Sequence, residues 1–418
     1  MEVKVTPGSV SGNIKAIASK SDAHRAIICA ALSDDKTSIH ISVTSQYIIA
    51  TLSCMEAFGA KVEKNGTEYI ITPVKEVLEN AVIDCNESGS TLRFLLPVAA
   101  ALGKGAKFLG RGRLPERPIG LIVDLLKEHG ISFSAEKLPL EIHGKLTPGE
   151  FKIEGNVSSQ FISGLMFALP LLEEKSKITL LSPLQSKAYV EMTISVLRKF
   201  GASIERAEDG FIVNPIGAYK SPGEYIVEGD WSNCAFFLVG AALAGDVKMT
   251  GLDFNSKQSD KAILDILKMA GADVKITEDG IAVSKSELKP FSMDFSECPD
   301  LFPISAVLAC GAEGKTTLFN AGRLRLKESD RIKTTKRLID GLGGKVKETK
   351  DSLVIYGKQK LRGGSVFGFN DHRIVMSAFI ASTICDGEVI VSGAEAVNKS
   401  YPDFIKDFES LGGETDVI

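Results

Sequence analysis

The feature that most constrains this 418-residue chain is one sequence pattern that occurs six times. Each copy ends a helix-like segment at a small residue beside glycine, just before a new strand, with a period of roughly 70 residues. The six stops are Phe58–Ala60, His129–Gly130, Phe200–Ala202, Ala270–Ala272, Leu342–Gly344 and Leu411–Gly413. Solenoid repeats are only about 20–50 residues long, so each unit is predicted to be a small packing module with two helices and several strands.

A polar cluster opens each copy and precedes an apolar, alanine-rich helix. Serine, aspartate, asparagine and glycine are N-cap signals at such positions. The clusters are Ser19–Asp22, Glu87–Thr91, Val157–Gln160, Gly229–Ser232, Cys298–Asp300 and Asn370–Arg373. Helix N-termini attract anions through their free N–H groups and their dipole. If pseudo-symmetry brings several ends together, they suit a small polyanion. The alternative is that the clusters only cap helices, although cationic residues lie beside four of them.

Within a unit, the pattern predicts helix, strand, loop, helix and hairpin. In the first unit these are a helix over 26–32, a strand over 37–43 and a helix over 49–58. Asn65-Gly66 then turns a hairpin between strands 61–63 and 69–72, and Asp-Gly pairs recur in later units. Strands joined by hairpins and others linked through helices imply mixed sheets with packed helices. We expect two α/β domains of three units each, divided near residues 222–229, with a cleft between them.

Composition excludes several classes of function. The chain is 44% apolar and 24% charged, with a net charge of −4 and a pI near 5.9, which gives no support for nucleic-acid binding. No apolar run reaches membrane-spanning length, and no targeting segment is expected before the first alternating strand. The seven scattered cysteines lack C-x-x-C spacing, which favours reduced thiols in a cytoplasmic protein. Phosphate-loop, dinucleotide-binding, hydrolase and metal-ligand motifs are not evident, so neither cofactor nor metal is expected.

Four polar segments are candidates for binding or chemistry. Residues 323–331 combine four cations and two carboxylates before a helix, and either a site or a solvated loop fits them. Arg373 opposes the dipole of the helix that it begins, so it should meet an anion or a nearby carboxylate. Arg117 lies between two prolines, either as a rigid anion clamp or in a turn ion pair. Capping accounts for one of Ser158, Ser159 and Gln160, but not for all three.

Eight motifs together resemble those of the 3-phosphoshikimate 1-carboxyvinyltransferase (EPSP synthase) family. They follow the family's order over nearly the whole chain, and their combination is far more specific than any one of them. The motifs begin with Ser19-Lys-Ser-x-x-x-Arg25-Ala, Leu114-Pro-Glu-Arg-Pro-Ile-Gly120, Val157-Ser-Ser-Gln160 and Ser186-Lys-x-Tyr189. They continue with Val227-Glu-Gly-Asp230, Pro299-Asp300, Leu326-Lys-Glu-Ser-Asp-Arg331 and Asn370-Asp-His-Arg373.

The resemblance implies a two-domain inside-out α/β barrel built from six βαβαββ-like units, with mixed sheets around buried helices. It places residues 1–18 and 229–418 in one domain and residues 19–228 in the other, with the active site in the interdomain cleft. The implied enzyme is a monomer that transfers the enolpyruvyl group of phosphoenolpyruvate to the 5-hydroxyl of shikimate 3-phosphate. The reaction belongs to chorismate and aromatic amino acid biosynthesis, and both substrates are small polyanions.

The resemblance also assigns binding residues. Those implied for shikimate 3-phosphate are Lys20, Ser21, Arg25, Ser158, Ser159, Gln160, Ser186, Tyr189, Asp300 and Lys327. Those implied for phosphoenolpyruvate are Lys20, Gly89, Arg117, Gln160, Arg331, Arg373 and Lys399. The implied mechanism is addition followed by elimination, with Asp300 as general base for the 5-hydroxyl. Glu328, assisted by Lys20, would protonate the enol methylene.

Alternatives and departures remain beside this interpretation. Taken alone, Asp300 after Pro299 is more simply explained as another N-cap. The family pattern Asn-Ala-Gly-Thr-Ala-x-Arg-Pro reads Glu87-Ser-Gly-Ser-Thr-Leu-Arg93-Phe94 here, and Glu87 is expected to alter affinity for phosphoenolpyruvate and for the competing herbicide glyphosate. Arg323 replaces a common asparagine near the sugar phosphate.

Two rival functions differ in class. One is the sister enolpyruvyl transferase of UDP-N-acetylglucosamine, which has the same fold but carries a cysteine in the loop that here spans Gly110–Pro118 without one. The other is a non-catalytic anion-binding relative. The presence of both Asp300 and Glu328 disfavours that rival, because anion binding gains nothing from buried carboxylates.

Overall fold

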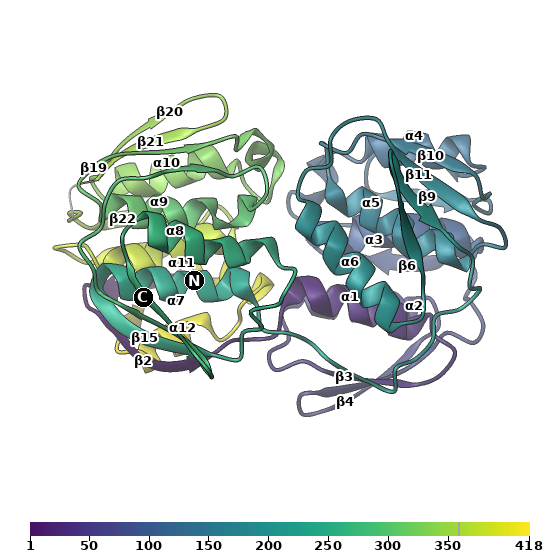
Figure 1. The fold of residues 1–418 in the computed structure, drawn as a ribbon, viewed down its shortest axis with the longest axis horizontal. Coiled ribbons are helices and arrows are strands. Elements are labelled where there is room, and N and C mark those ends of the chain that lie inside the picture. Colours follow the sequence, from purple (N-terminus) through teal and green to yellow (C-terminus); the bar gives the residue numbers. More distant parts are fainter. Residues whose placement is uncertain (358–359) are drawn as a thin grey trace. The chain divides into compact units, whose positions relative to one another are not determined.

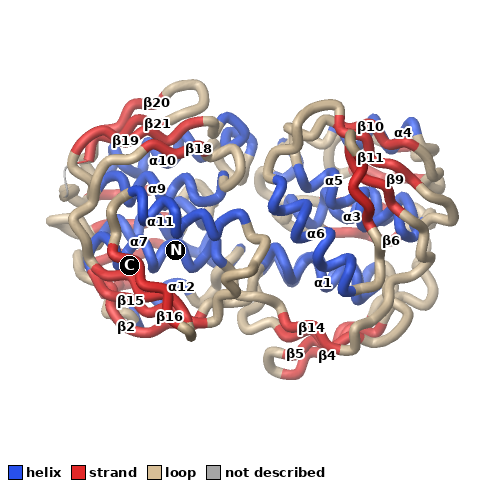
Figure 2. The backbone as a smooth tube through the Cα atoms, in the orientation of Figure 1, coloured by secondary structure: helices blue, strands red, loops and turns tan. Residues whose placement is uncertain are grey.

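A computed structural model describes residues 1–357 and 360–418, which form two compact units. Unit 1 contains Met1–Ser19 and Glu228–Ile418, and unit 2 contains Lys20–Val227. In each unit taken by itself, small sheets lie on the outside and helices run between them (Figures 1 and 2). Trp231–Leu243, for example, are buried along the whole length of one such helix. A helix that is apolar on every side requires this surrounded position.

The described strands form six separate four-stranded sheets of one design rather than a closed barrel. In each sheet the first two strands are parallel, and the next two continue in antiparallel pairs. Unit 2 contains β14(Glu224–Ile226)-β3(Thr37–His40)-β5(Glu68–Thr72)-β4(Lys61–Asn65), β6(Ala81–Asp84)-β7(Ala106–Leu109)-β9(Leu140–His143)-β8(Ser132–Phe133) and β10(Glu150–Ile153)-β11(Ser176–Leu180)-β13(Gly210–Val213)-β12(Ile204–Ala207).

Unit 1 repeats the design. Its sheets are β2(Val10–Lys15)-β15(Gly245–Thr250)-β17(Gly280–Ser284)-β16(Asp273–Thr277), β18(Ser292–Asp294)-β19(Gly314–Phe319)-β21(Leu353–Gly357)-β20(Lys345–Glu348) and β22(Gly364–Phe367)-β23(Val389–Ser392)-β1(Glu2–Thr6)-β24(Glu414–Val417). The predicted α/β class with six small mixed sheets is therefore confirmed.

Two helices belong to each sheet. The first of each pair is deeply buried: α1(Lys20–Ala31), α3(Gly89–Leu102), α5(Ser159–Ala168), α7(Trp231–Ala244), α9(Phe302–Cys310) and α11(His372–Ser382). The second of each pair has an exposed face: α2(Gln46–Ala57), α4(Gly120–Glu128), α6(Lys187–Lys199), α8(Ile263–Met269), α10(Arg331–Gly341) and α12(Phe404–Ser410). The short 3₁₀ helices are η1(Leu114–Glu116), η2(Leu169–Leu171), η3(Ser259–Ala262), η4(Pro299–Leu301), η5(Gly322–Leu326) and η6(Ala394–Lys399).

Two sheets take their first strand from a distant part of the chain. β2 is followed in sequence by α1 but pairs in parallel with β15. Conversely, β14 is followed by α7 but pairs in parallel with β3. A β-bridge joins Ala18 to Gly229 where the two connecting segments meet. The chain passes twice between the units, and at each passage the last strand before the passage stays in the unit that the chain leaves. Every sheet therefore has four strands.

The six sequence stops share one backbone geometry. A glycine with positive φ follows each second helix, at Gly59, Gly130, Gly201, Gly271, Gly343 and Gly412. At the first stop, Gly59 N donates to Glu56 O, and Ala60 N donates to Met55 O. The later stops repeat both bonds, as in a Schellman C-cap. Only glycine adopts this conformation without strain, which explains why the repeat is legible in the sequence.

The predicted helix starts were too late. α1 begins at Lys20 instead of residue 26, and α2 begins at Gln46 instead of residue 49. The polar residues before each apolar run form the first helical turn, and the Ser45 side chain accepts from Ile48 N as the cap of α2. The Asn65-Gly66 hairpin was predicted correctly, with β4 paired to β5. All seven cysteines are buried free thiols. No helix in the described ranges is long and apolar enough to cross a membrane.

Candidate active site

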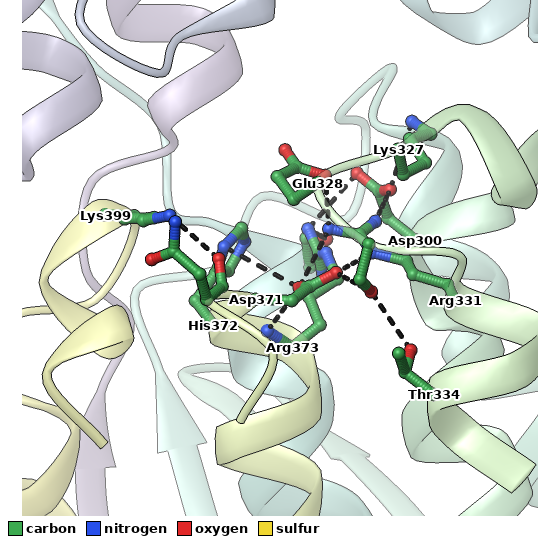
Figure 3. Close-up of polar contacts among 12 residues, drawn as sticks. Asp300, Lys327, Glu328, Arg331, Thr334, Asp371, His372, Arg373 and Lys399 are labelled. Atoms are coloured by element: carbon green, nitrogen blue, oxygen red, sulfur yellow. Dashed lines mark hydrogen bonds and ion pairs between the residues drawn. The ribbon is translucent and has the colours of Figure 1, made fainter. Parts of the chain in front are cut away.

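A cluster of charges in unit 1 is centred on Arg331 (Figure 3). Asp330 caps α10, so Arg331 is the first residue of that helix, and its side chain is only 1% exposed. The guanidinium bonds to three carboxylates. Its Nε lies 2.8 Å from Asp371 Oδ2, its Nη1 2.8 Å from Asp300 Oδ1 and its Nη2 2.8 Å from Glu328 Oε2. Burial opposes the charge of Arg331, but the three carboxylates outweigh it and raise the pKa well above the ordinary value.

Asp371 fixes this arrangement from the start of α11. It is fully buried, and its side chain caps the helix by accepting from Arg373 N. Oδ2 also accepts from Ser329 Oγ at 2.9 Å. Sequence reasoning included Asp371 in a polar cluster but gave no role to Asp371 or Ser329. The available signal was an N-cap aspartate two residues before an arginine, which marks a carboxylate held at a helix start.

Asp300 is not an N-cap, so the simpler interpretation of this residue was wrong. It lies inside η4, and neither η4 nor the following α9 has a side-chain cap bond. Its carboxylate instead accepts from Lys327 Nζ at 3.4 Å, from Arg331 at 2.8 Å and from Arg373 Nη2 at 3.2 Å. The side chain is 18% exposed, so a solvent-accessible carboxylate lies among three cations.

Residues 323–331 are packed rather than a solvated loop. Arg325 binds both carboxylate oxygens of Asp330 and also Glu348. Arg323 donates to the carbonyl of Ser296, and burial lowers the pKa of its guanidinium. These bonds hold the segment so that Lys327, Glu328 and Arg331 face the same cluster.

Arg373 does meet a carboxylate, one of the two partners predicted for it. Besides Asp300, its Nη2 donates to Ser232 Oγ in the first turn of α7 at 2.7 Å. Lys399, at the end of η6, donates to the Asn370 carbonyl at 2.8 Å and is almost completely buried. The structure thus brings Asp300, Lys327, Glu328, Arg331 and Arg373 into direct contact, with Lys399 on the other side of the Asn370–Arg373 turn (Figure 3).

In unit 2, a second group gathers at the start of α3. Gly89 is the first residue of that helix, capped by Ser88, and a Cβ at this position would lie 2.4 Å from Arg117 Nη1 and 2.7 Å from Arg93 Nη1. Arg93 Nη1 donates to Gln160 Oε1 at 3.0 Å, and Gln160 Nε2 donates to Ser90 Oγ at 2.8 Å. The absence of a side chain at Gly89 therefore lets two buried guanidinium groups lie over a helix N-terminus.

A third group surrounds Arg25 on α1. Its guanidinium donates to Thr193 Oγ1 at 2.8 Å and to the Tyr189 carbonyl at 3.1 Å, and also to the Ser21 carbonyl. It lies 5.0 Å from the centre of the Phe94 ring on α3. Burial lowers the pKa of Arg25 to about 10, against the opposing effect of Asp22. The Arg25 guanidinium therefore links the backbones of Ser21 and Tyr189.

The remaining predicted residues of unit 2 lie at helix starts. Ser158 caps α5 by accepting from Gln160 N, whereas Gln160 itself bonds to Arg93 and Ser90, so capping explains only one of the three residues. Ser159 is buried in the first turn. Ser186 precedes α6 with positive φ and makes no side-chain cap bond. Lys20 Nζ lies 5.0 Å from the centre of the Tyr47 ring.

Comparisons with known proteins identify the family. The family model for EPSP synthase (3-phosphoshikimate 1-carboxyvinyltransferase) matches residues 5–408, and the chain belongs to this family. It is 46% identical to the 3-phosphoshikimate 1-carboxyvinyltransferase of Clostridium novyi (strain NT), over 99% of this chain and 98% of that protein. It is 43% identical to the Clostridium acetobutylicum protein of that name, over 99% and 97%. An EPSP synthase structure from Acinetobacter baumannii matches with a TM-score of 0.84 and 25% identity, covering 100% of both chains.

The described residues contain no candidate metal site. Within residues 1–357 and 360–418, histidine, cysteine and carboxylate side chains do not gather in groups of three or more that could hold a metal ion. The charged groups described above are mostly arginines and lysines paired with carboxylates. Such a set suits anionic ligands by direct charge-assisted hydrogen bonds.

Proposed function

We propose that this protein is a 3-phosphoshikimate 1-carboxyvinyltransferase. It transfers the enolpyruvyl group of phosphoenolpyruvate to the 5-hydroxyl of shikimate 3-phosphate and releases phosphate. The observation that carries the proposal is the Arg331 cluster, in which Asp300 and Glu328 lie beside the cations Lys327, Arg331 and Arg373. Proton transfer needs the carboxylates and an anionic substrate needs the cations, and this cluster contains both.

The proposed chemistry is addition followed by elimination. Asp300 takes the proton of the 5-hydroxyl while the oxygen of that hydroxyl attacks C2 of phosphoenolpyruvate. Glu328, assisted by Lys20, gives a proton to the methylene carbon. The resulting tetrahedral ketal then loses a proton from its new methyl group, back to Glu328, as the bond from C2 to the phosphate oxygen breaks. The charge of the departing phosphate is met by Arg117, Arg331 and Arg373.

Arg331 also connects binding to proton transfer in this proposal. Its guanidinium bonds to both Asp300 and Glu328. A phosphate or carboxylate of the substrate would compete for the same N–H groups. Its arrival would loosen both ion pairs, so that Asp300 is available to take a proton and Glu328 can hold the proton that it gives to the methylene carbon. Charge-assisted bonds to the substrate thus prepare the base and the acid together.

The complete site is proposed to draw on both units. Phosphoenolpyruvate would bind Lys20, Gly89, Arg117 and Gln160 of unit 2 together with Arg331, Arg373 and Lys399 of unit 1. Shikimate 3-phosphate would bind mainly the Arg25 group and Ser158–Gln160, with Asp300 and Lys327 from unit 1. The proposal includes a monomer that works in the cytoplasm without a cofactor, in keeping with seven buried free thiols.

Phosphate release from purified protein tests the function. Phosphate should appear only when phosphoenolpyruvate and shikimate 3-phosphate are both present, with an equal amount of the enolpyruvyl ether product by NMR. Release with UDP-N-acetylglucosamine instead of shikimate 3-phosphate would favour the sister enzyme. Binding of both anions without turnover would favour a non-catalytic relative.

A further inference from the structure

A buried row of hydrogen bonds in unit 2 joins the first turn of α3 to α1. His24 Nδ1 lies 2.6 Å from Thr51 Oγ1 on α2, and Thr51 Oγ1 lies 2.7 Å from Thr91 Oγ1 on α3. Thr91 Oγ1 in turn donates to Ser88 Oγ at 2.7 Å. All four side chains are buried, with exposures of 0 or 1%. We call this set the hydroxyl relay.

The relay has a single direction. A hydroxyl has one hydrogen to donate, and Thr91 uses its own on Ser88. Thr91 must therefore accept from the Thr51 hydroxyl. Because Thr51 donates its one hydrogen to Thr91, it must accept from His24. This order assigns the hydrogen of the neutral imidazole to Nδ1 and leaves Nε2 as the unprotonated nitrogen.

A neutral His24 agrees with its surroundings. Burial first, and then the charges of Lys20 and Arg25 on the same helix, lower the pKa of His24 well below its ordinary value. Nε2 is buried and has no hydrogen-bond partner among the described residues. A proton there would be a buried donor without an acceptor, next to two cations, so the unprotonated form is strongly favoured.

The two ends of the relay lie beside groups assigned to phosphoenolpyruvate. His24 follows Lys20 by one helical turn, so the two side chains lie on one face of α1. At the other end, Ser88 caps α3 directly before Gly89, and the guanidinium groups of Arg117 and Arg93 lie next to the Gly89 backbone. The relay thus ties the helix turn that holds Lys20 to the turn that holds Gly89.

We propose that the hydroxyl relay positions Lys20 and the Gly89 turn for phosphoenolpyruvate, with His24 acting as a neutral positioning residue. This inference rests on the proposed function for the identity of the ligand. None of the four side chains is assigned to touch the substrate. A purely structural role would affect stability alone. The positioning role predicts a larger effect on phosphoenolpyruvate, which is assigned both Lys20 and Gly89, than on shikimate 3-phosphate, which is assigned only Lys20 of the two.

Thr51 offers the cleanest test, because valine has its shape without the hydroxyl. Thr51→Val should raise the KM for phosphoenolpyruvate about fivefold, as expected for one ordinary hydrogen bond. The KM for shikimate 3-phosphate should stay within about twofold. Thr51→Ser restores a hydroxyl and should return the KM to near the wild-type value. Thr37→Val is the matched control, since it removes another buried hydroxyl of unit 2, bonded to Ser221, away from these helix starts.

Equal KM changes for both substrates, or no change in Thr51→Val, would overturn the positioning role. If Thr51→Val fails to fold, Thr91→Val, which breaks the next bond, serves with the same readouts. Nitrogen NMR of His24 in the wild-type protein tests the relay without any activity. The shifts should report a neutral ring with its hydrogen on Nδ1 from pH 6 to 8, and an Nε2–H ring would contradict the relay.

The two proposals fail in distinguishable ways. A wild-type protein without phosphate release would refute the proposed function. Calorimetric binding of phosphoenolpyruvate to wild type and Thr51→Val, in the presence of shikimate 3-phosphate, would then decide the positioning role. An active wild type whose Thr51→Val variant binds phosphoenolpyruvate equally well would refute only the relay.

Discussion

Arg331 illustrates how single residues acquire their roles from their partners. An arginine at a helix start is opposed by the dipole, yet here three carboxylates compensate for it. Removing one partner of such a buried group is costly, because the other charge stays behind. Substitutions in this cluster are therefore informative only when the replacement retains shape and hydrogen bonding.

Asp300→Asn satisfies that condition and tests the general base. Asparagine keeps the size and can still accept from Arg331, but it cannot take a proton. We expect turnover to fall by a factor on the order of 10²–10⁴. Binding of shikimate 3-phosphate should fall much less, because Lys327, Arg331 and Arg373 lose a competing carboxylate. Steady-state rates with calorimetric binding measure both effects, and near-normal turnover would move the base elsewhere, with Glu328 the next candidate.

His24 makes a prediction about stability and pH. Its folded pKa is depressed, so below about pH 6.5 the unfolded chain binds a proton that the folded protein does not. The His24 contribution to stability is therefore complete above that pH and is lost as the pH falls, by about 1.4 kcal/mol per unit for one proton. The free energy of unfolding, measured with urea between pH 7.5 and 5.5, should depend less steeply on pH in His24→Gln than in the wild-type protein. Parallel slopes would mean that His24 is protonated in the folded protein.

At the scale of elements, sequence patterns predicted the sixfold repeat better than they predicted which side chains are in contact. The six stops were legible because glycine is required by the positive φ after each second helix. Helix starts were harder, because the polar residues of Lys20–Asp22 belong to the first turn of α1 rather than to the loop before it. Apolar periodicity alone cannot locate a turn made of polar residues.

Long-range polar contacts were beyond sequence reasoning for a different reason. Asp371 bonds to Arg331 across 40 positions, and Thr51 bonds to Thr91 across another 40. Cap signals describe local bonds and say nothing about distant partners. Ser88 and Thr91 stand where the family pattern has alanine. Their connection to His24 became visible only when α1, α2 and α3 were packed together.

A substitution at the α3 N-terminus can separate an effect on stability from an effect on substrate binding. In Gly89→Ala, the new Cβ would lie 2.4 Å from Arg117 Nη1, so a flexible side chain must move rather than the backbone. Alanine favours the helix, and stability should change by less than about 1 kcal/mol. The KM for phosphoenolpyruvate should rise severalfold as Arg117 is displaced. Gly120→Ala is the matched control at the first residue of α4, where a Cβ meets nothing within 4 Å. Equal kinetics in both variants would argue against a role for Arg117.

At the scale of the whole molecule, three similar sheets in each unit build two similar cores. The exchanged strands β2 and β14 make each unit depend on the segments that connect them. Cations assigned to the substrates are divided between the units, with Arg25 and Arg117 in one and Lys327, Arg331 and Arg373 in the other. A polyanion that binds both sets, as proposed above, would link the two units through charge-assisted hydrogen bonds.

This division predicts compaction on binding. Shikimate 3-phosphate together with glyphosate should decrease the radius of gyration measured by X-ray scattering in solution, as bridging anions draw the two units together. Inorganic sulfate at equal ionic strength is the control for general screening. An unchanged radius under saturating ligand would contradict a site shared by the two units.

The most direct test of the central claim follows one oxygen atom. In addition–elimination, the bond that breaks joins C2 of phosphoenolpyruvate to its bridging oxygen. Phosphoenolpyruvate labelled with ¹⁸O at that position should therefore release labelled phosphate, in a reaction that requires shikimate 3-phosphate, while the enolpyruvyl ether product carries no label. Label retained in pyruvate, with unlabelled phosphate, would mean cleavage at phosphorus by water. That result would contradict enolpyruvyl transfer by this protein.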